Sequence, residues 1–109
     1  MNEADHTMVL SYLKEKLRMS REPGAAEIED GHHLILKETR GQDVYCTWIY
    51  LEDGTLMETF LPEGRTPIEG TGSEIAKLEQ LELTWQSPDL LEIRVTDGGG
   101  NSGTGYFSF

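Results

Sequence analysis

Residues 44–60 constrain the fold most, because they have the pattern of a β-hairpin. β-Branched and aromatic residues fill both halves of this run, and Asp53-Gly54 lies between the halves. Asp-Gly is a typical two-residue hairpin turn, since each position of that turn adopts φ > 0. A turn of this length pairs Leu51 with Leu56 and thereby fixes the register of the whole hairpin.

The hairpin carries apolar side chains on both of its faces. The face opposite Leu51 holds Cys46, Trp48, Tyr50, Met57, Thr59 and Leu61. A strand that is apolar on both sides usually lies inside a sheet that is covered twice. We therefore predict that residues 44–51 form an interior strand of an antiparallel sheet. Cys46 is the one cysteine, so no intrachain disulfide is possible, and its place in this strand predicts a small buried hydrophobic side chain.

One helix is predicted, from about residue 5 to residue 20. Val9, Leu13 and Leu17 recur every four residues and give the helix one apolar stripe. Pro23-Gly24 ends it.

The two ends of this helix carry the groups that its backbone favours. Asp5 or Thr7 can accept the free N–H groups of the first turn. The cations at the C-terminal end match the helix dipole, and we interpret them as a solvated face rather than as a binding site. They are Lys14, Lys16, Arg18 and Arg21.

After the helix, apolar runs separated by turn residues about every ten positions predict a meander of strands. The expected strands cover 25–29, 33–39, 44–51, 56–60, 79–86 and 91–96, with an aromatic last strand at 106–109. Proline and glycine mark residues 61–72 as a loop. Ser73 is expected to cap a short helical turn that holds Ile75 and Leu78.

These elements predict an α+β fold in which the N-terminal amphipathic helix packs on an antiparallel meander sheet. The 109 residues suit a single soluble domain, with the helix at about 5–20 and the strands at about 25–109. The predicted core consists of Val9, Leu13, Leu17, Leu36, Ile49, Leu51, Leu83, Ile93 and Val95.

The charge balance excludes some classes of partner. With 20 acidic and 9 basic residues, the formal net charge is −11, which repels nucleic-acid backbones and anionic lipid. No apolar run approaches the ~20 residues of a membrane span, and the first five residues do not resemble a signal peptide. Either the protein is cytoplasmic, or an N-terminal hydrophobic segment has been removed and Met1 is not the native start.

His32-His33 is the obvious pair to consider as metal ligands. Adjacent residues of a strand point to opposite faces, so the two rings cannot both bind one ion in a regular strand. The chain also has no CxxC or HExxH spacing, and we therefore expect no zinc site.

The composition of the glycine-rich segment 97–105 suggests two kinds of ligand-binding loop, one for phosphate and one for calcium. A phosphate loop should open a helix, and no helical pattern follows. The oxygen donors for calcium are Asp97, Asn101 and Ser102, but the acidic spacing of a calcium-binding loop is absent. We expect no metal here and predict a flexible or bulged hairpin connection instead.

No pattern of catalytic residues is apparent, so we expect neither an enzyme nor a cofactor. The carboxylates mostly alternate with apolar residues or occupy turns, and no nucleophile-elbow pattern accompanies any serine. Trp48 and Trp85 can in principle stack on a sugar, but we predict that both belong to the core.

The order of elements resembles the soluble part of bacterial pilin-like proteins, in particular minor pilins and pseudopilins of type II secretion and of type IV or competence pili. The helix ends in the sequence Tyr-Leu-Lys-Glu-Lys-Leu-Arg, at 12–18, and is followed by a strand pair at 25–39. A strand with Tyr45 and Tyr50, the Asp53-Gly54 turn and the later strand pair at 81–95 complete the likeness. The spacing is similar to that of an uncharacterised, domain-of-unknown-function family of pilin-like proteins.

This resemblance implies a non-catalytic surface or filament component that contacts other pilin-like subunits or surface proteins. It also implies that the apolar N-terminal half-helix and its prepilin-peptidase site are missing, so that the full-length protein would be membrane-anchored at the cell surface. Two alternatives remain open. One is a cytoplasmic protein-binding module, and the other is a small carbohydrate-binding domain that uses Trp48 or Trp85.

Overall fold

A computed structural model describes residues 5–20 and 24–109, which form one helix followed by seven strands. The helix α1 covers His6–Arg18. The strands are β1 (Ala26–Glu29), β2 (His33–Arg40), β3 (Asp43–Glu52), β4 (Thr55–Pro62), β5 (Ser73–Ser87), β6 (Leu90–Asp97) and β7 (Ser102–Ser108). This is the α+β class that the sequence predicts. No helix in the described part of the chain has the length and hydropathy of a membrane span.

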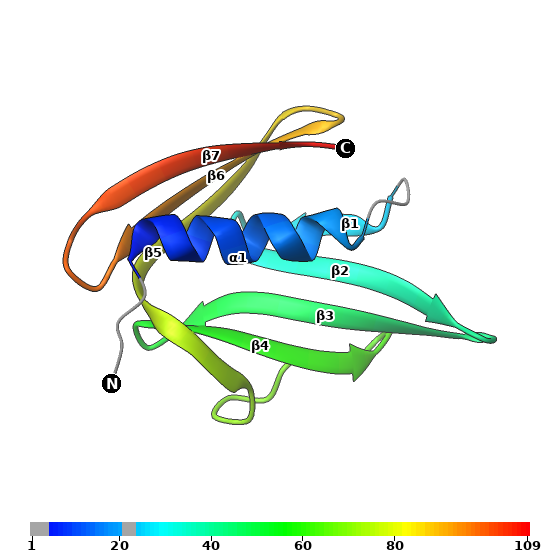
Figure 1. Ribbon diagram of the computed structural model, residues 1–109. Helices are drawn as coiled ribbons and strands as arrows, with labels where there is room; N and C mark the ends of the chain where they lie inside the picture. Colours follow the sequence, from blue (N-terminus) through cyan, green and yellow to red (C-terminus); the bar gives the residue numbers. More distant parts are fainter. Residues whose placement is uncertain (1–4, 21–23) are drawn as a thin grey trace.

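The strands follow one another in the order β1 to β7, and every neighbouring pair is antiparallel. β5 connects two halves of the sheet, because its first residues pair with β4 and its later residues pair with β6. The sheet bends along β5, and α1 lies between the two halves (Figure 1). The sheet therefore curves around the helix.

The hairpin predicted at residues 44–60 is confirmed. Asp53 and Gly54 have φ angles of 49° and 76°, as the two-residue turn requires. Leu51 pairs with Leu56 in the predicted register. β3 has a strand on each side, so its interior position is also confirmed.

The helix begins and ends close to the predicted residues. Asp5 is its N-cap, and the Asp5 carboxylate accepts a hydrogen bond of 2.9 Å from the N–H of Met8. The helix stops at Arg18, with Met19 as the C-cap. Residues 21–23, and with them Arg21 and the predicted Pro23 stop signal, lie outside the described residues.

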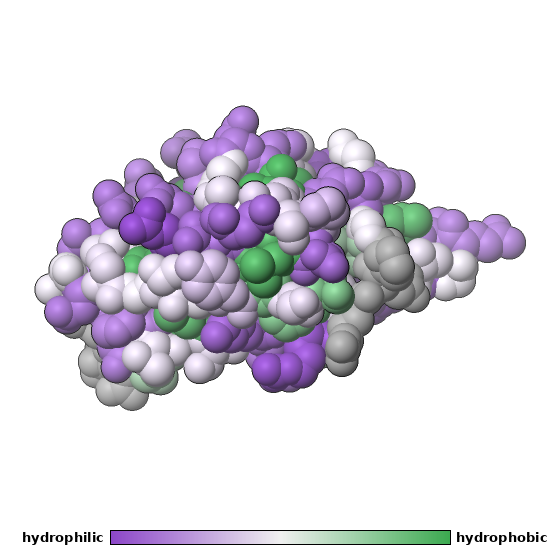
Figure 2. Space-filling view, turned by 90° about the horizontal axis from the view of Figure 1, so that it is seen from above, coloured by the Kyte–Doolittle hydropathy of each residue, from purple (hydrophilic) through white to green (hydrophobic). Residues whose placement is uncertain are grey.

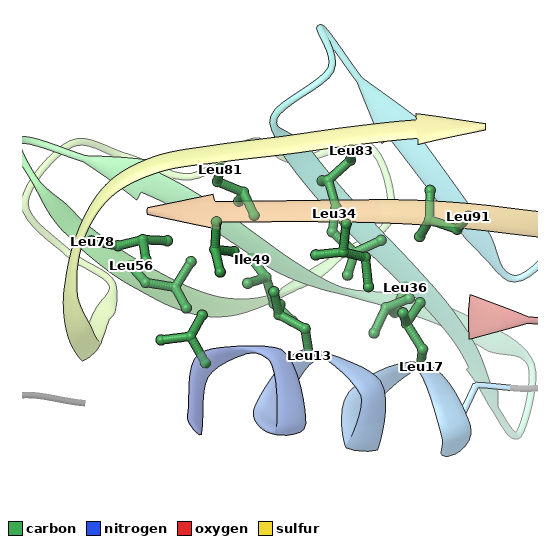
Figure 3. Close-up of a cluster of buried hydrophobic side chains, with 13 residues drawn as sticks. Leu13, Leu17, Leu34, Leu36, Ile49, Leu56, Leu78, Leu81, Leu83 and Leu91 are labelled. Atoms are coloured by element: carbon green, nitrogen blue, oxygen red, sulfur yellow. The ribbon is translucent and has the colours of Figure 1, made fainter. Parts of the chain in front are cut away.

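The core forms where α1 meets both halves of the sheet. Leu13 and Leu17 point from the helix toward side chains of β2, β3, β5 and β6 (Figure 3). Eight of the nine predicted core residues are buried, and Leu51 is partly buried against the same cluster. Burying each such aliphatic side chain contributes about 1.5–3 kcal/mol, so the helix and the sheet stabilise one another. The core residues are Val9, Leu13, Leu17, Leu34, Leu36, Ile49, Leu56, Leu78, Leu81, Leu83, Leu91, Ile93 and Val95.

The prediction of a helical turn after Ser73 is wrong, because Ser73 begins β5. The local residues, which include glutamate, alanine, lysine and leucine, are good helix formers. In the fold, Ala76 and Lys77 pair instead with Leu56 and Thr55 of β4. β4 would otherwise leave backbone groups without partners along this edge, and pairing satisfies them.

The prediction that the glycine-rich connection extends to residue 105 is also wrong, since β7 begins at Ser102. Two glycines of this strand lie directly under the helix. A Cβ atom on Gly103 would stand 2.6 Å from Cδ2 of His6 and 3.2 Å from Cδ1 of Leu10, and one on Gly105 would stand 3.0 Å from Cε of Lys14. Glycine is needed here because α1 packs closely against β7.

The face of the molecule that is seen from above in Figure 2 is mainly polar. Seen from above, it is mostly hydrophilic, and hydrophobic residues appear in small separate patches (Figure 2). This distribution agrees with the formal net charge of −11.

We expect Gly103→Ala to lower the free energy of unfolding by about 1–3 kcal/mol, the usual effect of overpacking. The added methyl group would displace the ring of His6, which is held by Asp97. Urea denaturation measures the loss. Gly99→Ala is the matched control, because its Cβ would meet only ordinary contacts at 3.4 and 3.5 Å. Equal midpoints for the two variants would show that the helix does not depend on this close approach.

Candidate functional site

The face of β1–β4 that is turned away from α1 carries a second apolar cluster. Ile35, Cys46, Trp48, Tyr50 and Met57 are all at least 94% buried, although no helix in the described part of the chain covers them. Their positions follow from strand alternation, which places them opposite the residues that face α1. The burial predicted for Cys46 is confirmed, and burial raises the pKa of its thiol. A buried thiol with a raised pKa is a poor nucleophile.

Charged side chains and a loop cover this second cluster in place of a helix. Lys37 pairs with Glu27 at 2.8 Å and with Glu63 at 3.5 Å. These two carboxylates, Glu27 first, raise the pKa of Lys37. The loop 63–72 is tied to β3, because the N–H of Gly70 donates a 3.1 Å hydrogen bond to Glu52. The covering of both faces of β3, which the sequence predicts, is therefore achieved by two different means.

A depression of about 320 Å³ opens between this loop and the sheet. Glu29 and His33 come from the β1–β2 hairpin, and Trp48 and Tyr50 come from β3. Three of the described lining residues are glutamates. No described lining residue is a lysine or an arginine. The depression is lined by Glu29, His33, Trp48, Tyr50, Leu51, Glu52, Thr66, Pro67 and Glu69.

Two lining residues of the depression, Glu29 and His33, form a group with Asp30 of the adjoining turn. One carboxylate oxygen from each acid and one ring nitrogen of His33 lie within 4.8 Å of one another. Glu29 and His33 are a cross-strand pair, and Asp30 follows Glu29 in the turn with φ of 55°. The hairpin register therefore fixes Glu29 and His33 at one corner of the sheet, and the turn adds Asp30 beside them.

The aromatic residues next to this group are closely packed. The ring of His33 lies 6.1 Å from the rings of Trp48 and Tyr50, measured between centroids, and meets Trp48 edge to face. The Tyr50 hydroxyl contacts the Thr59 hydroxyl at 3.2 Å. The indole N–H of Trp48 is buried and has no hydrogen-bond partner among the described residues. A buried donor of this kind costs about 1–3 kcal/mol, so its presence needs an explanation.

Reasoning from the sequence missed this grouping because it considered His32 together with His33. The structure places His33 with Glu29 and Asp30, and His32 is not part of the group. The available signal was the Asp30-Gly31 turn, because a tight hairpin there brings Glu29 opposite His33.

The prediction of a core position holds for Trp48 but is wrong for Trp85. Trp48 is 6% exposed, whereas Trp85 is 39% exposed and lies 5.5 Å from the ring of Phe109. Alternation correctly places Trp85 on the same face as Leu83. It does not reveal that Trp85 lies near the end of β5, where its aromatic neighbour is itself exposed.

The three calcium candidates of the glycine-rich segment take part in hydrogen bonds within the protein. Asp97 is buried, and its carboxylate accepts hydrogen bonds of 2.9–3.0 Å from the N–H groups of His6, Gly99 and Asn101. The His6 ring lies 3.2 Å from the same carboxylate. The hydroxyl of Ser102 contacts Thr96 at 2.8 Å. Asp97 thus joins the turn after β6 to the first residue of α1.

Hydrogen bonding lowers the pKa of Asp97. The N–H of Asn101 has the largest effect, and the groups of His6 and Gly99 add to it, while burial opposes them. These donors stabilise the charged carboxylate. The geometry therefore favours a structural role for Asp97.

A second polar network lies where α1 contacts β4. The hydroxyl of Tyr12 donates to Glu58, and Lys16 pairs with the other oxygen of the same carboxylate at 3.0 Å. Burial, followed by Glu58, raises the pKa of Tyr12. Arg18, another member of the predicted basic cluster, pairs with Glu15 on its own helix.

Together, these features define a small α+β domain in which an N-terminal helix lies in a curved meander sheet with an acidic depression on its outer face. The chain belongs to the DUF4860 family, described as a domain of unknown function, whose family model matches residues 4–98. This match includes all the residues that line the depression. No curated protein and no solved structure matches the chain.

We expect Asp97→Asn to destabilise the protein, and to do so more at neutral pH than in acid. Because the pKa of Asp97 is lower in the folded chain, its contribution is complete above the unfolded pKa of about 3.9. The contribution is lost as the pH falls through the lower, folded pKa. Thermal unfolding of both proteins from neutral to acidic pH measures this. Asp89→Asn, at an exposed turn residue, is the control, and a loss that is independent of pH would contradict the role of the charged carboxylate.

We also expect millimolar calcium to leave the melting temperature unchanged. A cation at Asp97 would have to compete with the hydrogen bonds that the carboxylate already accepts from three backbone N–H groups. Differential scanning fluorimetry with calcium, and with magnesium for comparison, tests this. A rise that saturates with calcium and is lost in Asp97→Asn would overturn the expectation.

Proposed function

We propose that this domain is a non-catalytic, pilin-like surface or filament component that acts through contacts with other proteins. The observation that carries the proposal is the place of α1, which precedes the sheet and lies along its concave face (Figure 1). The apolar stripe of Val9, Leu13 and Leu17 is fully buried there. A lone N-terminal helix packed on an antiparallel meander is the arrangement that the resemblance to pilins implies.

The proposal places the full-length protein at the cell surface, anchored by an apolar segment upstream of α1. Asp5 has an extended backbone, with φ of −82° and ψ of 174°, and its side chain caps the helix. In this conformation, an upstream helix would be joined to α1 through a non-helical residue. If Met1 is the native start, the alternative is a cytoplasmic protein-binding module.

We place the contact surface at the aromatic patch, which consists of Trp85, Phe107 and Phe109. The ring of Phe109 lies 5.5 Å from that of Trp85 and 4.9 Å from that of Phe107. Trp85 and Phe109 are 39% and 36% exposed. Aromatic residues are enriched in protein interfaces and often dominate their binding energy.

The exposed ring of Trp85 also favours a second candidate, a small carbohydrate-binding domain. Trp85 can present one ring face to a sugar, with Phe109 beside it. Trp48 offers no such face, because it is 94% buried, even though it lines the acidic depression. The two candidates use the same patch but differ in its ligand.

We test the proposal with a photo-crosslinking amino acid in the parent gene, expressed in its own cell. We expect the reading frame to encode an apolar segment directly before α1. We also expect crosslinks from positions 85 and 109 to another subunit with an apolar N-terminal segment. Thr84 is the matched control, because it is exposed on the opposite face of β5.

Three outcomes would contradict the pilin-like proposal. A reading frame that starts at Met1 would contradict the membrane-anchored form of the protein. Equal crosslinking from positions 84 and 85 would contradict the aromatic patch as the contact surface. Saturable binding of a sugar that is lost in Trp85→Ala, together with no protein adduct, would favour the carbohydrate-binding candidate.

A further inference from the structure

We propose that Glu29, Asp30 and His33 bind one divalent transition-metal ion, of the zinc, cobalt or nickel class, at the turn between β1 and β2. One potential ligand atom from each residue lies within 4.8 Å of the others. A single ion between them needs only small changes of rotamer to reach bonding distance, because zinc binds nitrogen and oxygen at about 2.0–2.2 Å.

The backbone holds two of these ligands rigidly. Glu29 ends β1 and His33 begins β2, and the two residues pair directly across the hairpin. Asp30 is next to Glu29, in a turn closed by Gly31, which has φ of 76°. Ligands that are held at strand positions keep their geometry better than ligands on free loops.

The mixture of donors selects the class of metal. One imidazole with two carboxylates suits zinc and the neighbouring transition metals, whereas calcium and magnesium prefer sites made entirely of oxygen. Three protein ligands leave a position open for a further ligand. The side of the site that faces the depression is lined by Glu52 and Glu69 as well, so the local field attracts cations.

Trp48 lines the same depression as Glu29 and His33. Its indole N–H is buried, is a donor only, and has no acceptor among the described residues. The Trp48 ring lies 6.1 Å from the ring of His33. A metal ion held by His33 would therefore lie near the Trp48 ring, whose fluorescence can report its binding.

This inference departs from the sequence-based expectation of no metal site. That expectation rested on His32 and His33 pointing to opposite faces of a strand. The structure needs only one of the two histidines, because the other ligands come from the preceding strand and turn. The inference does not depend on the proposed pilin-like function, and either can fail without the other.

Quenching of Trp48 fluorescence by Ni²⁺ provides the test. In a Trp85→Phe protein, Trp48 is the one remaining tryptophan, since the chain has two. We expect saturable quenching at one Ni²⁺ per chain, and tighter binding of Zn²⁺ measured by competition. In the same background, His33→Ala and Glu29→Gln should each weaken binding roughly 10-fold or more, the scale seen when groups that support a metal site are removed.

His32→Ala is the matched control, because it removes the adjacent exposed imidazole, whose ring lies 4.7 Å from that of His33 between centroids, and keeps all three ligands. It should bind Ni²⁺ like the parent, and far-UV circular dichroism should show that every variant keeps its fold. The proposal is overturned if quenching is absent, if His32→Ala and His33→Ala lose binding equally, or if Glu29→Gln binds unchanged. Equal competition by millimolar calcium would also overturn it, because it would indicate only nonspecific attraction to an acidic surface.

Discussion

The burial of one face of α1 in a curved sheet is the interaction on which the rest of this structure depends. Val9, Leu13 and Leu17 meet side chains from both halves of the sheet, so one helix completes a core that neither half can close alone (Figure 3). The curvature comes from β5, which pairs first with β4 and then with β6, and whose register with β6 shifts between Leu78 and Gln80. A bulge of this kind increases the bend and twist of a strand.

Polar contacts and glycines set how the helix lies in this curve. Asp97 joins the end of β6 to His6 at the start of α1, and the glutamate Glu58 binds Tyr12 and Lys16 further along. Gly103 and Gly105 leave room for the helix over β7. The glycine-rich segment therefore allows α1 to pack closely on the sheet. The buried carboxylate of Asp97 in this segment stabilises the turn after β6 and the start of α1.

The outer face of β1–β4 shows how the same strands create a second, more unusual environment. Trp48, Tyr50 and Met57 are buried under a loop and a group of ion pairs rather than under a helix. This thin cover leaves an acidic depression with an aromatic floor, next to the Glu29–His33 pair. This corner of the sheet therefore differs chemically from the rest, where apolar packing accounts for the buried residues. The aromatic patch at the ends of β5 and β7 is a separate surface with its own proposed role.

Local patterns in the sequence determined much of the fold. The four-residue spacing of Val9, Leu13 and Leu17 identified the helix and its buried face, and Asp53-Gly54 fixed the central hairpin, because dihedral preference and side-chain periodicity are properties of short segments. Only the tertiary structure decided that residues after Ser73 extend β5, that Trp85 is exposed, and that Gly103 belongs to a strand beneath the helix. Each of these depends on a neighbour that is distant in the chain. The grouping of Glu29, Asp30 and His33 depends on both kinds of information. The turn that brings the three residues together is local. The depression and the buried indole of Trp48 form only when β3 and the loop 63–72 pack together.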